Sequence, residues 1–230
     1  MPKGKSAMKD APTPRDFRSL LRTARNDVKE KYRLECEFIL RVIGELGLRP
    51  GELAHLKESW VDFDEQEIAI PEQESCTKGR DNGPCGYCKK RAKSIAKHHD
   101  DISYEKAVVS RWQPKSGPRG VWFGWDDELF DLLDEYLSLN GEYQHSRVSV
   151  NRRISRVARV NARLDEEDVY PAALRAHAAL LHARKGVRAP HLMEYMGWSK
   201  VDPAVECIRM TSGDTKSEFQ RAHRTPINQV

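Results

Sequence analysis

Apolar side chains recur at spacings of three and four residues through much of the chain, and this pattern restricts the fold to a mainly helical one. A helix is expected over roughly residues 27–45, with an apolar stripe comprising Leu34, Phe38, Ile39, Val42, Ile43 and Leu46. A second is expected to start at Asp126, a suitable N-cap, with a stripe comprising Leu129, Leu132, Leu133, Tyr136 and Leu137. These stripes predict one helical core.

Proline and glycine mark the ends of the other predicted helices. Thr13 followed by Pro14 is a typical cap and first helical position, so order is expected to begin there. Residues 171–186 and 190–197 each begin with proline and end with glycine, and a last helix is expected from residue 202. We expect a flexible tail over residues 1–14, one domain over 15–210 and a C-terminal tail over 211–230, because a chain of 230 residues buries one core with a small appendage.

Three short stretches have strand character instead. Ile68 and Ile70 alternate with polar or small neighbours, and strand character returns in residues 106–114 and again in 120–125. The turn-rich sequence "KSGPRG" separates the last two stretches. We therefore predict an α+β, mainly α, fold with a small three-stranded antiparallel sheet, in which residues 72–105 are inserted between the first two strands.

The inserted segment carries a cysteine pattern that is typical of a metal site. Cys76, Cys85 and Cys88 occur within thirteen residues, and His98 and His99 follow. Cys85-x2-Cys88 is the knuckle spacing of tetrahedral Zn²⁺ sites, so we predict structural zinc held by the three cysteines and by His98 or His99. Free surface thiols are the alternative. Cys36, by contrast, falls on a predicted apolar helix face and is interpreted as a core residue.

Charge and hydropathy narrow the class of protein without deciding it. Thirty-nine Lys and Arg against 35 Asp and Glu give a net charge of +4, which permits nucleic-acid binding without requiring it. No stretch approaches the ~20 apolar residues of a membrane span, and the N-terminus lacks the apolar core of a signal peptide. We therefore expect a soluble, cytoplasmic protein with no membrane partner.

Four motifs follow one another along the chain: "GLRPGELAHL" at 47–56, "QPKSGPRGVWF" at 113–123, "PAALRAHAALLHARKGV" at 171–187 and "LMEYMGWS" at 192–199. In this order they resemble the catalytic domain of the tyrosine recombinases, the phage-integrase family, and the resemblance covers about residues 13–210. By this resemblance two arginines hold the scissile phosphate, an acidic residue orients the first, and a lysine protonates the leaving oxygen. The matching positions are Arg49, Glu52, Lys115, Arg119, Arg175 and Trp198. Cysteine-rich inserts resemble those of archaeal members.

The chain departs from the family at two positions that concern the chemistry. The motif histidine is replaced by Ala172, and His177 should not compensate, because at 100° per residue it points about 200° away from Arg175. The position of the nucleophilic tyrosine holds Cys207, and Tyr195 precedes Gly197 on another helix. Cys207 is interpreted as a core residue, so strand cleavage is expected to be lost.

A basic amphipathic helix is expected within residues 149–163. It offers arginines for phosphate contacts or a DNA groove, although a solvated face accounts for it equally well. These residues are Arg152, Arg153, Arg156, Arg159 and Arg163.

Three hypotheses follow from these observations. The first is an inactive double-stranded DNA-binding protein that acts as a regulator, accessory factor or DNA-organising factor, with an origin in a virus or mobile element implied by the resemblance. The second is an active strand transferase that uses Cys207 or a tyrosine from elsewhere. The third is a protein-interaction module, or homo-oligomer, whose final segment from Ile208 onward docks on a neighbour.

Overall fold

The computed structural model describes residues 6–79, 82–109 and 112–213. Its helices are α1 (Pro14–Asn26), α2 (Arg33–Gly44), α3 (Pro50–Leu53), α4 (Gly86–His98), α5 (Tyr104–Val109), α6 (Asp127–Asn140), α7 (Arg147–Val160), α8 (Pro171–Arg184), α9 (Ala189–Met196) and α10 (Asp202–Thr211). Short 3-10 turns occur at η1 (Glu30–Tyr32), η2 (Glu58–Trp60) and η3 (Glu166–Asp168). The strands are β1 (Val61–Asp62), β2 (Glu67–Ile70) and β3 (Arg119–Trp122).

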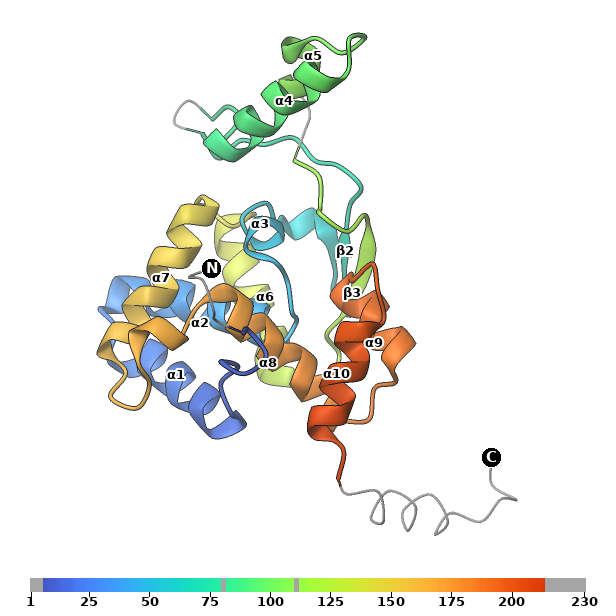
Figure 1. Cartoon of the computed structure of the whole chain (residues 1–230). Helices are drawn as coiled ribbons and strands as arrows, with labels where there is room; N and C mark the ends of the chain where they lie inside the picture. The colour runs from blue at the N-terminus through green and yellow to red at the C-terminus, as the bar shows by residue number, and fades with distance from the viewer. Residues whose placement is uncertain (1–5, 80–81, 110–111, 214–230) are drawn as a thin grey trace.

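Helix α2 is the centre of the main core. It packs against α1, α6, α7 and α8, and its residues Phe38, Ile39 and Val42 are completely buried (Figure 1). The apolar stripe predicted for this helix is confirmed: the helix is buried from Phe38 to Gly44, and Leu34 is partly buried against the core. Cys36 lies in the same core, as predicted.

Local capping signals determine where several helices begin and end. The Thr13 hydroxyl accepts a hydrogen bond from the backbone N–H of Asp16 at the start of α1. Asp126 likewise accepts from the N–H of Leu129 at the start of α6, and α6 ends at Gly141 with a left-handed φ of 68°. Both predicted N-caps are confirmed.

The sheet has three antiparallel strands in the order β1-β2-β3, but its strands differ from the predicted ones. Val61 pairs with Ile68 and Ile68 with Val121, so residues 61–70 supply two strands of a hairpin, not one. The prediction of a strand over 106–114 was wrong, since Tyr104–Val109 is helix α5 and Trp112 only bridges to Glu74. The insertion therefore lies between the second and third strands.

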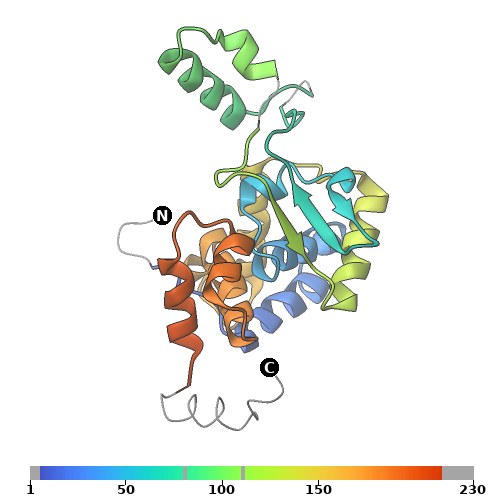
Figure 2. The ribbon, with the colours of Figure 1, turned by 90° about the vertical axis from the view of Figure 1, so that its right-hand side faces the viewer.

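Helices α4 and α5 project away from the body (Figures 1 and 2). The two chain segments that join this hairpin to the body run close together, from β2 outward and back to β3. We call α4 and α5 with their connection the arm. The arm overlaps the inserted segment expected over residues 72–105, and its base adjoins the site described below.

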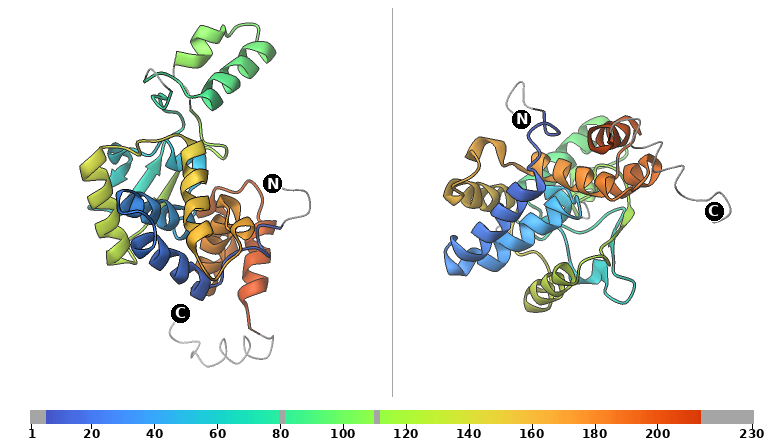
Figure 3. Two further views of the ribbon diagram at one scale, coloured as in Figure 1. Left: turned by 90° about the vertical axis from the view of Figure 1, so that its left-hand side faces the viewer. Right: turned by 90° about the horizontal axis from the view of Figure 1, so that it is seen from below.

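Helices α8, α9 and α10 form a second apolar cluster, on the side opposite α6 (Figures 2 and 3). It comprises Ala179, Leu180, Ala183, Leu192, Met196, Ala204 and Cys207. Residues 6–13, placed by the sequence in a flexible tail, also pack here: Met8 and Ala11 contact this cluster, and Pro12 accepts a hydrogen bond from His177. Most of the predicted C-terminal tail, residues 214–230, lies outside the described part of the chain.

No helix within the described ranges is long and apolar enough to cross a membrane.

Candidate anion-binding cleft and metal centre

A cleft of about 560 Å³ lies between the base of the arm, α3, the connection before β3, and the first turns of α7 and α8. It brings together five of the motif positions, whose first and last members are more than a hundred residues apart in sequence: Arg49, Glu52, Lys115, Ala172 and Arg175. Its wall also contains Pro50, Gly51, Tyr87, Trp112, Gln113, Arg147, Asn151, Tyr170 and Pro171. The motifs therefore converge in space.

Arg49 stands at the N-cap of α3, where Pro50 starts the helix. Its Nη1 donates to Glu52 Oε1 at 3.0 Å and to Ser116 Oγ at 2.5 Å, and its Nη2 donates to the carbonyl of Gly197 at 2.8 Å. Three anchors thus hold the guanidinium, whereas its Nε has no partner within the described residues. The plane of the fork is set before any ligand arrives.

Glu52 is the centre of this network and is almost completely buried. Its Oε2 also accepts from the backbone N–H of Arg49 at 2.7 Å, and both carboxylate oxygens accept from the guanidinium of Arg119 at 2.8 Å. Burial favours the protonated acid, but the hydrogen bonds and charge of Arg119, together with Arg49, outweigh it and lower the pKa of Glu52. Glu52 therefore stays ionised and orients Arg49.

Arg119 was predicted to contact DNA, but the structure places it behind the cleft. Its side chain is only 4% exposed, its Nη atoms bind Glu52, and its Nε donates to the carbonyl of Tyr195 at 2.9 Å. Arg119 does not line the cleft among the described residues. It positions Glu52, and through Glu52 it positions Arg49.

Arg175, on α8, is anchored by backbone carbonyls. Its Nε donates to Gly47 at 2.7 Å and its Nη2 to Met196, the residue next to the carbonyl that holds Arg49. Gly47 has a left-handed φ of 70°, and an added Cβ would lie 2.7 Å from the sulfur of Met196, so this approach requires glycine. The Nη1 of Arg175 has no partner within the described residues.

The site carries an excess of positive charge. Three guanidinium groups, those of Arg49, Arg119 and Arg175, share one carboxylate, that of Glu52, which leaves a net charge of +2 before Lys115 is counted. Burial and the charges of Arg49 and Arg119 lower the pKa of Arg175 to about 9. An anion in the cleft would relieve this repulsion, which makes the cleft suited to phosphate.

The remaining motif positions are divided between the cleft and the core. Lys115 is exposed in its turn and lines the cleft, and so does Ala172. Trp198 is partly buried against the α8–α10 cluster and does not line the cleft within the described residues.

Cys207 is completely buried in the α8–α10 cluster, with its Sγ 3.7 Å from the sulfur of Met8, and burial raises its pKa to about 11. It does not line the cleft. His177 also points away from the cleft: its ring stacks on Phe17 and its Nδ1–H donates to Pro12. The position of Cys207 agrees with its interpretation as a core residue, and that of His177 agrees with the expectation that it does not replace the missing histidine.

The predicted basic helix corresponds to α7, and most of its arginines are used within the protein. Arg153 Nε donates to Glu35, Arg159 pairs with Glu166, and Arg163 just beyond the helix pairs with Asp16. Arg153 and Arg156 also lie over the ring of Tyr32, with the guanidinium carbons 4.3 and 4.2 Å from the ring centroid. Arg152 remains exposed and without a partner in the described part of the chain.

Two tyrosines in the cleft wall were not predicted. The hydroxyl of Tyr170 donates to Asp10 at 2.6 Å, and burial together with this bond raises the pKa of Tyr170 to about 12. Tyr87 lies inside the Cys85-x2-Cys88 knuckle, is half exposed, and has the guanidinium of Arg147 over its ring. The sequence signal that could have placed Tyr170 in the cleft wall is its position directly before Pro171, where a motif helix begins.

The three clustered cysteines meet as predicted, but their fourth partner is His55. The ligand atoms of His55, Cys76, Cys85 and Cys88 all lie within 4.8 Å of one another. His55 Nε2 lies 3.2 Å from Cys76 Sγ and 3.8 Å from Cys88 Sγ. Tetrahedral bonds of about 2.0–2.3 Å place ligand atoms about 3.3–3.8 Å apart, so the four residues fit one metal ion.

The prediction of His98 or His99 as the fourth ligand is corrected. His98 ends α4, ten residues beyond Cys88, and a helix rises about 15 Å over that length. Both histidines are exposed, and the Nδ1–H of His98 donates to the carbonyl of Ser94. His55 belongs to the motif "GLRPGELAHL", but its separation of 21 residues from Cys76 carries no recognisable spacing.

The metal cluster is joined to the wall of the cleft. His55 Nδ1–H donates to the carbonyl of Gly51 at 2.8 Å, which directs Nε2 toward the cysteines. The ring of His55 stacks on Trp112, with centroids 4.8 Å apart. Gly51 and Trp112 both line the cleft, so the turn that carries Arg49 is attached to the cluster.

No family model and no curated protein matches the chain. Among solved structures it is similar to the Tn1549 transposon integrase in complex with transposon right end DNA, with a TM-score of 0.62 and 15% identity over 93% of this chain and 65% of that chain. XerA recombinase has a TM-score of 0.57 and 18% identity over 94% and 65%, and the catalytic domain of bacteriophage HP1 integrase 0.53 and 16% over 95% and 96%.

At such identities these similarities establish the fold alone. The chain spans slightly less than two thirds of the Tn1549 integrase and XerA structures, but nearly all of the HP1 catalytic domain. The chain therefore has the fold of a recombinase or integrase catalytic domain, mainly helical with a small antiparallel sheet, and a four-residue group that could hold a metal ion.

Proposed function

We propose that the protein binds double-stranded DNA through a backbone phosphate held in this cleft, that it derives from a tyrosine recombinase, and that it does not cut the strand. The observation that carries the proposal is the pair of guanidinium groups of Arg49 and Arg175, anchored on the carbonyls of the adjacent residues Gly197 and Met196. Guanidinium groups that are held in place and still have N–H donors without partners are suited to bind the two non-bridging oxygens of a phosphate.

Each group in the cleft has a distinct role in this binding. The Nε of Arg49 and the Nη1 of Arg175 supply the donors without partners, and exposed Lys115 adds a mobile positive charge at the cleft edge. Glu52 and Arg119 hold Arg49 in place, so the fork is organised before DNA binds. The complexes of the Tn1549 transposon integrase with transposon right end DNA and with circular intermediate DNA support a DNA ligand for this fold.

The proposal that cleavage is lost rests on what the matching positions contain. Ala172 has no group that could move a proton, although it lines the cleft. Cys207 is buried among apolar side chains with a raised pKa, whereas a nucleophilic thiol needs exposure and a lowered pKa. The protein would then act as a regulator, accessory or DNA-organising factor.

The test of DNA binding uses fluorescence anisotropy with a 30-base-pair duplex at low salt. The double variant Arg49→Lys, Arg175→Lys keeps the charge but removes the forks, and we expect its affinity to fall at least tenfold. The control is Arg18→Lys with Arg22→Lys, two exposed arginines of α1 that make no ion pair within the described residues. Equal affinities of the two variants would refute a phosphate clamp.

A specific observation keeps an active enzyme as the second candidate. Tyr87 and Tyr170 line the cleft, so each could present a hydroxyl to the phosphate. Incubation with a nicked suicide duplex separates the candidates: we expect no covalent adduct. An adduct abolished by Tyr170→Phe, Tyr87→Phe or Cys207→Ala would identify the nucleophile and overturn the proposal of inactivity.

We further propose that the metal is structural Zn²⁺ with a Cys3His ligand set. Three thiolates and one imidazole, with no carboxylate, suit zinc, and the closed set of four leaves no position for a substrate. Contacts among the three thiols lower the pKa of Cys76 and raise that of Cys88, and a bound metal ion would hold all three as thiolates. Elemental analysis of untagged protein should give one zinc per chain, and His55→Ala should reduce it whereas His98→Ala should not.

A further inference from the structure

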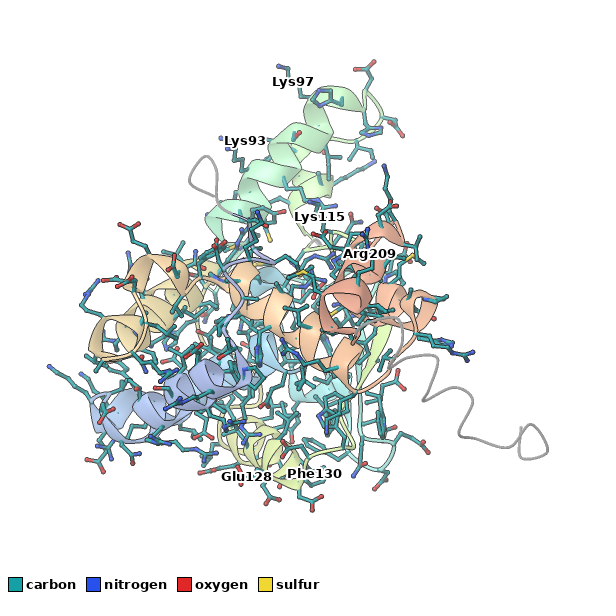
Figure 4. All side chains as sticks on the ribbon, turned by 60° about the horizontal axis from the view of Figure 1, so that its bottom comes forward. Lys93, Lys97, Lys115, Glu128, Phe130 and Arg209 are labelled. Carbon is teal, nitrogen blue, oxygen red and sulfur yellow. The ribbon has the colours of Figure 1, made fainter. Side chains whose placement is uncertain are left out.

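The arm has one strongly basic face on α4. Lys89, Lys93 and Lys97 recur every four residues, and at 100° per residue they span an arc of about 80°, which Lys90 extends to about 100°. No acidic residue occurs in α4. Figure 4 shows Lys93 and Lys97 projecting from α4, and Lys115 near the base of the arm. We call these four lysines of α4 the lysine face.

The opposite side of α4 attaches the helix to the protein. Cys88 and Ala92 are buried, on the side about 130° from the middle of the lysine face. Cys88 belongs to the metal cluster, and Arg91 donates to the carbonyl and to the side-chain oxygen of Gln113, at 2.9 and 2.7 Å. Gln113 lines the cleft. The arm is therefore held in a defined orientation relative to the cleft.

The lysine face is unlike the other basic surfaces of the protein. On α7 the arginines at 153 and 159 are paired with carboxylates, and Arg41 of α2 contacts four. On the lysine face no ammonium group has an ion pair within the described residues, although Asp100 and Asp101 follow the helix directly. Like charges four residues apart repel along a helix, so the face lacks the compensation that the chain supplies elsewhere.

The lysine face begins beside the cleft and extends away from it. Tyr87, in the first turn of α4, lines the cleft, and Lys97 lies ten residues further, which is about 15 Å along the helix. At 3.4 Å per base pair this distance corresponds to about four base pairs of backbone. The arm thus continues the positive surface of Arg49, Lys115 and Arg175 outward.

We propose that the lysine face is a second DNA-binding surface, which contacts the phosphates about four base pairs beyond the one in the cleft. It makes sequence-independent contacts, because lysine ammonium groups bind phosphates as point charges. The metal cluster fixes the base of the arm, so the angle between the two surfaces depends on the cluster. This inference rests on the proposed function of the cleft.

The first test compares two triple variants by anisotropy with a 30-base-pair duplex between 50 and 200 mM salt. The arm variant carries Lys89→Gln, Lys93→Gln and Lys97→Gln, and the matched control carries Lys29→Gln, Lys31→Gln and Lys185→Gln, three exposed lysines of the body. We expect the arm variant to lower the slope of log affinity against log salt by about 2.7, and affinity at 100 mM by tenfold or more, with the control unchanged.

The second test uses the unaltered protein and does not depend on the folding of a variant. Lysine acetylation is read by mass spectrometry with and without the duplex, and we expect protection of Lys89, Lys93 and Lys97 but not of Lys29, Lys31 or Lys185. Unprotected arm lysines together with an unchanged salt slope would overturn the inference. Failure of the unaltered protein to bind any duplex would instead refute the proposed function. Stronger protection of the arm lysines by single-stranded RNA than by duplex would refute double-stranded DNA as the ligand of the lysine face.

Discussion

Glu52→Gln should destabilise the protein far more than the loss of an ordinary surface carboxylate. The carboxylate of Glu52 is 1% exposed and accepts four hydrogen bonds, two from Arg49 and two from Arg119, which use all its lone-pair positions. A glutamine oxygen accepts only two of them, and its NH₂ group faces a guanidinium donor. Two charge-assisted hydrogen bonds at about 1.5–3 kcal/mol each predict a loss of about 3–6 kcal/mol.

The cost of breaking a buried ion pair gives a similar loss of stability. Removing one partner of a buried pair costs about 3–5 kcal/mol because the other charge is left uncompensated, and the side chain of Arg119 is only 4% exposed. The pKa of Glu52 lies below its ordinary value of 4.5, so this stabilisation is complete at neutral pH and is lost as pH falls through the lowered pKa. The variant should therefore differ most from the unaltered protein above about pH 5.

The assay is urea unfolding followed by tryptophan fluorescence at pH 7. Glu166→Gln is the matched control, because its partner Arg159 is exposed and the pair should contribute nothing measurable. A second comparison isolates the pair: Glu52→Met with Arg119→Met together should cost less than Glu52→Met alone, since no charge is then left buried. A loss below about 1 kcal/mol for Glu52→Gln, or strict additivity of the two methionine substitutions, would refute the reasoning.

Three further predictions concern the cluster, the core and the cleft. Removal of the metal by a chelator, or by Cys85→Ser with Cys88→Ser, should weaken duplex binding at least tenfold, because the cluster holds the turn that carries Arg49. The same duplex affinity with and without the metal in anisotropy titrations would contradict this prediction. Burial lowers the pKa of His177 to about 4, so the folded state resists its protonation. The free energy of unfolding should therefore fall as pH drops from 6.5 to 4. In urea titrations, His177→Asn should reduce the difference in unfolding free energy between pH 7 and pH 4.5 by roughly 2–3 kcal/mol. Gly197→Ala should cost about 1–2 kcal/mol in the same titrations and weaken DNA binding, because its φ is 60° and the new Cβ would lie 2.5 Å from a serine oxygen that also holds Arg49.

The parts of the fold that depend on neighbouring residues were predicted well. The stripe of α2, the caps Thr13 and Asp126, and the glycine ends of α8 and α9 all agree with the structure. These signals act over one or two helical turns, where side-chain spacing and backbone conformation largely decide the outcome.

The errors fall where the decisive contact is distant in sequence. The segment 106–114 contains β-branched residues, yet the Ser103 hydroxyl accepts a hydrogen bond from the backbone N–H of Lys106 at the start of α5. Residues 106–109 therefore belong to the arm instead of the sheet. His55 was missed because nothing local distinguishes it from any other histidine at the end of a short helix. Only the folding of the cysteine segment back onto α3 makes it a neighbour of Cys76.

The motif order alone identified Arg49, Lys115 and Arg175 as members of one site, and their convergence in the cleft agrees with that prediction. By its resemblance to the tyrosine recombinases, the sequence also predicts that Ala172 and Cys207 occupy the positions where that family has its histidine and its tyrosine. What only the tertiary structure decided is how the charges are shared. Arg119 binds Glu52, the arginines of α7 are largely paired within the body, and the lysines of α4 have no ion pair among the described residues. Charge is a property of composition, but its availability to a ligand depends on which groups the fold brings within hydrogen-bonding distance.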